Sequence, residues 1–183
     1  MPPILLFLGD LDERHGADLL LRAMPSISRH HPRARLAMIG DGPLREALAA
    51  YSRYLQLEEV VSFLPERRMP YYADAIHSAD VVVVPGRQAI STSAIQTAWW
   101  AGKPVVATHE AASGFAEHER DALLAYPSEN SIATAVLRLL NDPELARKLG
   151  EEGRRRFAED FTNCSSRTDS SLDVAPDNYD PEL

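Results

Sequence analysis

The sequence predicts an α/β domain in which a parallel sheet carries helices on both faces. Short apolar runs typical of buried strands alternate with segments whose apolar residues recur at helical spacing. The connections are short, and most of them carry glycine or proline. The chain of 183 residues shows this alternation at least five times, which favours one domain with a sheet covered on both faces.

The expected strands are short and mostly apolar. The run of four valines that ends in Pro85-Gly86 is the clearest, because no polar residue interrupts it. In chain order the expected strands are Ile4–Leu8, Arg35–Ile39, Val60–Leu64, Val81–Val84, Val105–Ala107 and Ala122–Ala125.

The segments between these strands have helical spacing of their apolar residues. The expected helices run from Ala17 toward Ile27 and over Leu44–Tyr54, Met69–Ala79, Ser93–Trp100, Ser131–Leu140 and Glu144–Phe157. Trp99 and Trp100 are adjacent in one of them, so their side chains diverge by about 100°. We therefore expect one tryptophan in the core and the other at a surface or an interface.

The domain is expected to cover residues 1–161. From Thr162 onward the sequence has few large apolar residues and no periodicity, which predicts a polar, disordered tail over 162–183.

Composition excludes several classes of function. The formal net charge of −8 argues against nucleic acid as the main partner. No apolar run approaches the roughly 20 residues of a membrane helix. The single cysteine, Cys164, excludes an internal disulfide and fits the cytoplasm, and the six histidines show no metal-ligand spacing, so no metal is expected.

Right-handed crossovers place the loops after parallel strands on one rim, where α/β proteins bind ligands. On this rim Arg87 is the best cation for a phosphate, ahead of Arg14, Arg67 and Arg68. The turn that begins at Gly40 either lies near the ligand or simply joins a strand to a helix.

A helix N-terminus on the same rim offers a second phosphate site. Ser91, Thr92 and Ser93 precede or begin the expected helix, so they either hold a phosphate or, in the case of Ser93, cap the helix. His109 and Glu110 follow the fifth strand, at a place that faces the ligand rim, so they are either catalytic or, as polar loop residues more often are, solvated; we expect both to be solvated.

Six fragments in the right order resemble the donor-binding half of a retaining GT-B glycosyltransferase of the group 1, or family 4, type. The resemblance covers about Ile4–Phe161, and its fragments are 8–21, 35–46, 61–64, 79–85, 101–108 and 139–150. It implies a Rossmann-like domain that binds a nucleotide-diphosphate sugar as substrate, with no cofactor. It also implies an acceptor-binding domain or subunit that this chain does not contain.

The chain departs from that family at four positions where family members carry a charged side chain. The family's first loop usually begins Gly-Arg and ends Lys-Gly, whereas this chain has Gly9-Asp10 and His15-Gly16. The family also has two glutamates, one near the sugar and one near the ribose hydroxyls. Counted back from the Gly-Lys-Pro motif, they correspond to Ala89 and Thr97, and the glycine-rich turn between them is replaced.

The first functional hypothesis is therefore a donor domain for retaining glycosyl transfer, with weak or no activity in this chain alone because two cations and two carboxylates are missing. Its candidate donor-binding residues are Gly9, Asp10, His15, Gly16, Gly40, Arg87, Ser91, Thr92, Ser93 and Thr97. The alternative is a catalytically inactive scaffold that binds a nucleotide or a partner. A plain dinucleotide-binding domain is a third interpretation, which the missing Gly-x-Gly-x-x-Gly spacing disfavours.

Overall fold

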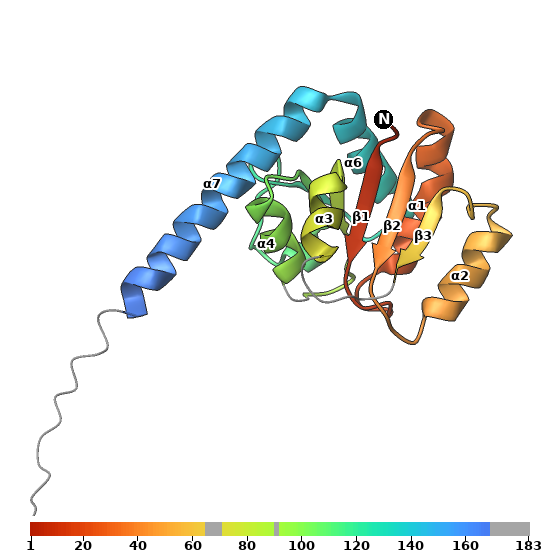
Figure 1. The fold of residues 1–183 in the computed structure, drawn as a ribbon, viewed down its shortest axis with the longest axis horizontal. Helices are drawn as coiled ribbons and strands as arrows, with labels where there is room; N and C mark the ends of the chain where they lie inside the picture. Colours follow the sequence, from red (N-terminus) through yellow and green to blue (C-terminus); the bar gives the residue numbers. More distant parts are fainter. Residues whose placement is uncertain (65–70, 90–91, 169–183) are drawn as a thin grey trace, which may run out of the picture.

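The computed structural model describes residues 1–64, 71–89 and 92–168, and Figure 1 shows them as one sheet with helices on both sides. All strand pairings in the sheet are parallel, and the strand order is β3-β2-β1-β4-β5-β6. The predicted fold class is therefore confirmed. The strands are β1 (Ile4–Leu8), β2 (Arg35–Ile39), β3 (Val61–Leu64), β4 (Val81–Val84), β5 (Val105–Thr108) and β6 (Leu123–Ala125).

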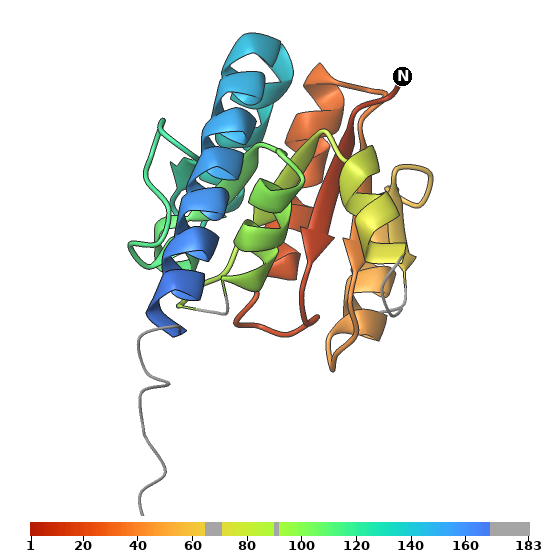
Figure 2. The ribbon, with the colours of Figure 1, turned by 60° about the vertical axis from the view of Figure 1, so that its left-hand side comes forward.

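The sheet is buried on both faces, which explains why its strands are almost continuously apolar. Side chains alternate along a strand, so Leu5 and Phe7 of β1 enter one core cluster while Leu6 and Leu8 enter the other. The first cluster includes residues of α1, α2 and α6, and the second includes residues of α3, α4 and α5. In Figure 2, α7 and α4 lie side by side over the second face.

The helices agree with the expectations except at two places. They are α1 (Ala17–His30), α2 (Arg45–Tyr54), α3 (Tyr71–Ser78), α4 (Ser93–Trp100), α5 (His109–Ala112), α6 (Glu129–Asn141) and α7 (Pro143–Thr168). The single turn α5 was not predicted, because four residues are too short to show a period. The last helix continues past Phe157, where we expected it to end, as far as Thr168. Residues 169–183 lie outside the described part, so the tail stays a prediction.

Trp99 of α4 is the centre of the contact between α7 and the rest of the domain. Its side chain is fully buried and stacks on Phe115 at 5.1 Å between ring centroids, while its indole N–H donates to the Asp121 carbonyl at 3.0 Å. The guanidinium of Arg156 in α7 lies over the Trp99 ring and pairs with the buried Asp121 carboxylate. Trp100 is 48% exposed, which confirms that only one of the two tryptophans belongs to the core.

None of the helices in residues 1–64, 71–89 and 92–168 combines the length and the apolarity that a membrane span requires.

The close approach of α7 to Trp99 gives a test of this packing. A Cβ atom at Gly153 would lie 2.2 Å from Trp99 Cδ1, and the indole is too tightly enclosed to move away. We therefore expect Gly153→Val to lower the free energy of unfolding by about 2 kcal/mol or more, as overpacked cores do.

Urea unfolding followed by circular dichroism measures this change. Lys148→Ala, an exposed change in the same helix, is the control and should stay within about 0.5 kcal/mol of the parent. Equal stability of Gly153→Val and the parent would show that α7 does not pack on Trp99 in this way.

Candidate functional site

The candidate site lies where the strand order reverses, between β1 and β4. From β1 the chain proceeds to β2 on one side, and from β4 it proceeds to β5 on the other, so the loops after these two strands separate. Ligands of open α/β sheets bind in the crevice formed at this point. Its walls here are the loop after β1, residues 9–16, and the described part of the loop after β4, residues 85–89, together with the N-terminus of α4.

The two loops touch at Gly16. This residue has a φ of 68°, and a Cβ atom there would lie 2.0 Å from the Pro85 carbonyl oxygen. Only glycine therefore fits both the backbone conformation and the contact. Gly16 is predicted to bind the donor, and the structure shows that it also fixes the distance between the two walls of the crevice.

Gly9 and Gly40 hold the loop after β1 against the turn after β2. The Gly9 N–H donates to the Ile39 carbonyl at 3.2 Å, and a Cβ atom on Gly40 would lie 1.9 Å from the Gly9 carbonyl oxygen. The Leu11 N–H donates to the Asp41 carbonyl at 2.8 Å. The turn at Gly40 thus has a packing role of its own, which favours the structural interpretation of this turn.

Acidic side chains shape the loop after β1. His15 Nδ1 lies 2.7 Å from Asp12 Oδ1, the same oxygen accepts the His15 N–H at 2.9 Å, and Arg14 donates to Asp12 Oδ2 at 3.0 Å. Burial alone would raise the pKa of Asp12, but the hydrogen bonds from His15 and Arg14 outweigh it and lower the pKa to about 2. Asp10 is exposed beside this group. The wall of the crevice therefore carries the exposed carboxylate of Asp10, and a carboxylate of Asp12 paired with Arg14 and His15, where the family resemblance implies two cations.

Asp10, Asp12 and His15 also bring three potential metal ligand atoms within 4.8 Å of one another. Asp12 and His15 already satisfy each other, and exposed acidic groups often gather without an ion. We assign no metal to them.

Arg87 has partners other than the phosphate that we expected. Its guanidinium donates to both carboxylate oxygens of Asp18 at 2.6 Å, and to the Glu13 carbonyl at 2.9 Å. Asp18 is a functional candidate that the sequence did not reveal, because an acidic residue in the first turn of a helix is already explained by the helix dipole.

The N-terminus of α4 forms the opposite wall. Thr92, not Ser93, occupies the N-cap position, and it makes no side-chain capping hydrogen bond. Capping by Ser93 was therefore a wrong expectation, since Ser93 is the first residue of the helix itself. The hydroxyl of the half-buried Thr97 donates to the Ser93 carbonyl at 2.6 Å. The exposed Ala89 precedes this wall, whereas Ser91, Arg67 and Arg68 lie outside the described residues.

Thr108 is a second residue that the sequence reasoning missed. It is fully buried, its hydroxyl donates to the Gly86 carbonyl, and the same oxygen accepts the Ala111 N–H at 3.2 Å as the N-cap of α5. It thereby ties the loop after β4 to β5. A threonine directly after an apolar strand was the available signal, because threonine is a common N-cap.

The two polar residues after β5 behave differently from each other. His109 is exposed, as expected, and its ring lies 5.3 Å from that of Tyr126. Glu110 is half-buried, and its Oε2 atom is enclosed without a hydrogen-bond partner among the described residues. The expectation that Glu110 is solvated was therefore wrong.

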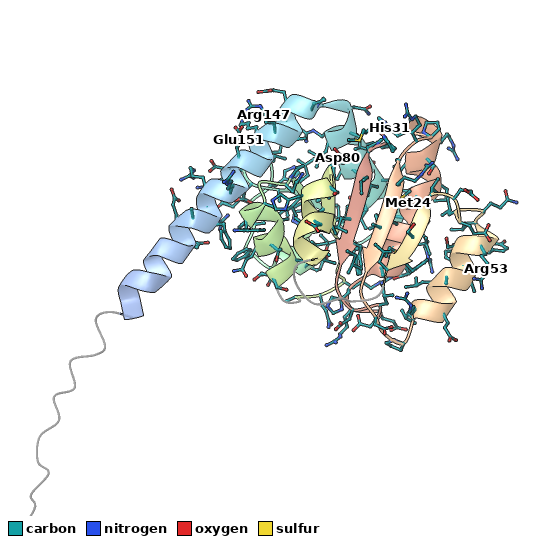
Figure 3. All side chains as sticks on the ribbon, in the orientation of Figure 1. Met24, His31, Arg53, Asp80, Arg147 and Glu151 are labelled. Carbon is teal, nitrogen blue, oxygen red and sulfur yellow. The ribbon has the colours of Figure 1, made fainter. Side chains whose placement is uncertain are left out.

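A cavity of about 460 Å³ lies at the opposite edge of the sheet, where the strands begin, and is bounded in part by Asp80, Arg147 and Glu151. Figure 3 labels these three residues at the end of the molecule where β1 starts. Arg147 is already paired with Glu144 and Glu151. The cavity is remote from the crevice, so we do not include it in the candidate site.

The sheet, its reversal point and the glycine-bounded loop define a Rossmann-like domain of the kind that binds nucleotides at one rim. Comparison with known sequences makes this class more specific. The model of the family described as glycosyl transferases group 1 matches residues 2–142, and the chain belongs to that family. The predicted resemblance is therefore confirmed.

Relatives in the family include enzymes of polysaccharide and glycolipid synthesis. Over 177 residues the chain is 29% identical to the lipopolysaccharide core biosynthesis glycosyltransferase LpsD of Rhizobium meliloti, covering 93% of this chain and 48% of that protein. It is 31% identical over 165 residues to the GDP-mannose-dependent alpha-(1-6)-phosphatidylinositol monomannoside mannosyltransferase of Mycolicibacterium smegmatis, covering 83% of this chain and 42% of that protein. The chain thus spans about half the length of the curated relatives that it matches.

Solved structures show the same fold. The C-terminal domain of the group 1 family protein LpcC from Francisella tularensis matches with a TM-score of 0.79 at 16% identity, covering 87% of this chain and 86% of that domain. HepE of Anabaena, in complex with UDP, matches with a TM-score of 0.80 at 20% identity, covering 92% of this chain and 49% of that protein. The chain therefore has the fold of one half of a GT-B glycosyltransferase.

The lowered pKa of Asp12 predicts a pH-dependent contribution to stability. A carboxyl group whose pKa is lower in the folded state stabilises the protein above its unfolded pKa of about 4, and this contribution is lost as the pH falls toward about 2. We expect Asp12→Asn to cost about 1–2 kcal/mol at pH 7 and progressively less below pH 4.

Urea unfolding at pH 7 and at pH 3 measures the difference. Asp10→Asn, an exposed change in the same loop, is the matched control, because it leaves the hydrogen bonds of Asp12 to His15 and Arg14 in place. An equal cost of Asp12→Asn at both pH values would contradict the role of the charged carboxylate.

Proposed function

We propose that this chain is the donor-binding half of a retaining glycosyltransferase and holds a nucleotide-diphosphate sugar in the crevice between β1 and β4. The observation that carries the proposal is the N-terminus of α4 in a chain of this family: it opens on the strand-order reversal, and its N-cap residue Thr92 makes no side-chain capping hydrogen bond. The first amides of a helix attract anions, and a diphosphate fits such a position. The acceptor is held by a domain or subunit beyond this chain.

Backbone groups supply most of the proposed diphosphate site. The loop bounded by Gly9 and Gly16 approaches the crevice with its main chain, and Thr92 and Ser93 begin the opposite wall. His15 is the nearest replacement for a family cation, but it already pairs with Asp12. Thr97 offers a neutral hydroxyl in place of a carboxylate. The proposed site thus relies on main-chain groups and has less charge complementarity to a diphosphate than the resemblance implies.

The same substitutions set a low expectation for catalysis. A leaving diphosphate accumulates negative charge, and catalysis requires preorganised positive groups near it. In this chain the first loop carries Asp10 where the resemblance implies a cation, and its Arg14 and His15 are paired with Asp12. We therefore propose weak or no transferase activity for the isolated chain.

A second function, a scaffold that binds a nucleotide or a partner without catalysis, is favoured by one observation. Ala89 and Thr97 stand where the resemblance implies two carboxylates, so the residues that contact sugar and ribose in relatives are absent together.

Titration calorimetry with UDP-, GDP- and ADP-sugars tests the donor-binding proposal. We expect one of these series to bind with micromolar affinity. Affinity weaker than about 1 mM for all of them would contradict the proposal and leave the scaffold as the better account.

Reversing the charge of the first loop provides a sharper test. We expect Asp10→Arg to tighten binding of the preferred nucleotide about tenfold, because it replaces repulsion of the diphosphate by attraction. Glu58→Arg makes the same charge change on an exposed residue before β3, at the far edge of the sheet, and serves as the control. Equal affinities of the two variants would show that the first loop does not face the phosphates.

A further inference from the structure

We propose that Arg87 is a positioning residue that locks the loop after β1 to the loop after β4 and so sets the width of the crevice. This inference deepens the proposed function, since it concerns the same donor site, but it assigns Arg87 to the protein framework and not to the phosphate.

Arg87 makes four hydrogen bonds away from its own loop, two to the loop after β1 and two to Asp18 in the first turn of α1. The guanidinium binds both carboxylate oxygens of Asp18, each at 2.6 Å, and the Glu13 carbonyl at 2.9 Å. The main-chain N–H of Arg87 donates to the Arg14 carbonyl at 2.9 Å. The side chain and the backbone of one residue therefore both attach to the segment that ends the first loop.

The ion pair has a favourable geometry for this role. Two parallel N–H···O bonds between a guanidinium and a carboxylate fix orientation as well as distance, which a lysine cannot do. The side chain of Asp18 is only 19% exposed, compared with 37% for that of Arg87. Burial alone would raise the pKa of Asp18, but the hydrogen bonds and charge of Arg87 outweigh it and hold that pKa below its usual range. The carboxylate thus remains charged and holds the guanidinium.

The neighbouring contacts explain why this lock matters at the crevice. Gly16 packs directly on the Pro85 carbonyl, so the two loops are already at the closest approach that glycine permits. A shift of either loop would move the amides of the first loop relative to the N-terminus of α4. A phosphate that recruited Arg87 would first have to separate it from Asp18. Arg87 therefore acts on a bound donor through the position of the first loop.

The variant Asp18→Asn distinguishes the two roles of Arg87, because a lock and a phosphate ligand predict opposite changes in UDP affinity. Asp18→Asn weakens the lock but leaves the cation of Arg87 in place. If Arg87 is a lock, Asp18→Asn should raise the hydrogen-exchange rate of the amides of residues 10–16 about tenfold in the ligand-free 183-residue chain. It should also weaken UDP binding several-fold. Had Arg87 been a phosphate ligand, the same variant would release it, tighten UDP binding and leave the exchange unchanged. That result would overturn the proposal.

The charge-swapped double variant Asp18→Arg with Arg87→Asp provides the second measurement. We expect Arg87→Met to raise exchange in residues 10–16 and weaken UDP binding, and the swap to restore both at least in part. If the folded double variant exchanges the amides of residues 10–16 as fast as Arg87→Met does, the proposal is overturned. If the double variant does not fold, the result for Asp18→Asn decides. Arg22→Met is the matched control, because Arg22 also approaches Asp18, at 3.9 Å, but from the same helix.

The exchange measurement needs no nucleotide. A parent chain that binds no UDP, GDP or ADP sugar would contradict the proposed donor site, while the exchange of residues 10–16 in Asp18→Asn would still support or overturn the lock. The two proposals therefore fail in distinguishable ways.

Discussion

The parallel pairing of β1 with β4 is the constraint on which the rest of this structure depends. Leu5 and Leu6 align with Val81 and Val82 across this junction, although 76 residues of chain separate each pair. Every other strand is added outward from these two, β2 and β3 on one side and β5 and β6 on the other. The same junction separates the loops that form the crevice. One pairing thus lies at the centre of the hydrophobic core and, among the six strands that the structure describes, at the point where the strand order reverses and adjacent loops diverge.

Two glycines at the rim allow the loops that form the crevice to pack closely against one another. Gly16 and Gly40 each stand where a side chain would collide with a neighbouring carbonyl, so at these two points three loops approach one another through main-chain atoms. Of the side chains at the rim, that of Arg87 adds contacts between the loop after β4 and the first loop, whereas those of Asp10 and Ala89 take no part in these close approaches. The chain can therefore keep the fold of its family while Asp10 and Ala89 differ in charge from what the resemblance implies.

Much of the fold could be predicted from the sequence because burial on both faces leaves a strong pattern. The valine run of β4 and the helical spacing of α1 placed these elements nearly where the structure has them. The contact between Arg87 and Asp18 could not be predicted, because it joins residues 69 positions apart whose local roles were already explained. Thr108 and Glu110 were missed for a related reason: a sequence gives the direction of a side chain only where a long periodic element defines it. The sequence thus placed the candidate residues on the loops after the strands, while the contacts of Arg87, Thr108 and Glu110 were visible only in the structure.

The packing of α7 on Trp99 connects the terminal helix with the crevice through α4. Helix α4 has eight residues, about 12 Å of rigid rod, with Trp99 near its carboxyl end and the rim of the crevice at its amino end. Arg156 and Gly153 of α7 pack against Trp99 at the carboxyl end of this helix. One helix, α4, therefore both packs against α7 and forms the rim of the crevice. The long terminal helix thus contacts an element of the candidate site, although none of the described side chains of α7 belongs to that site.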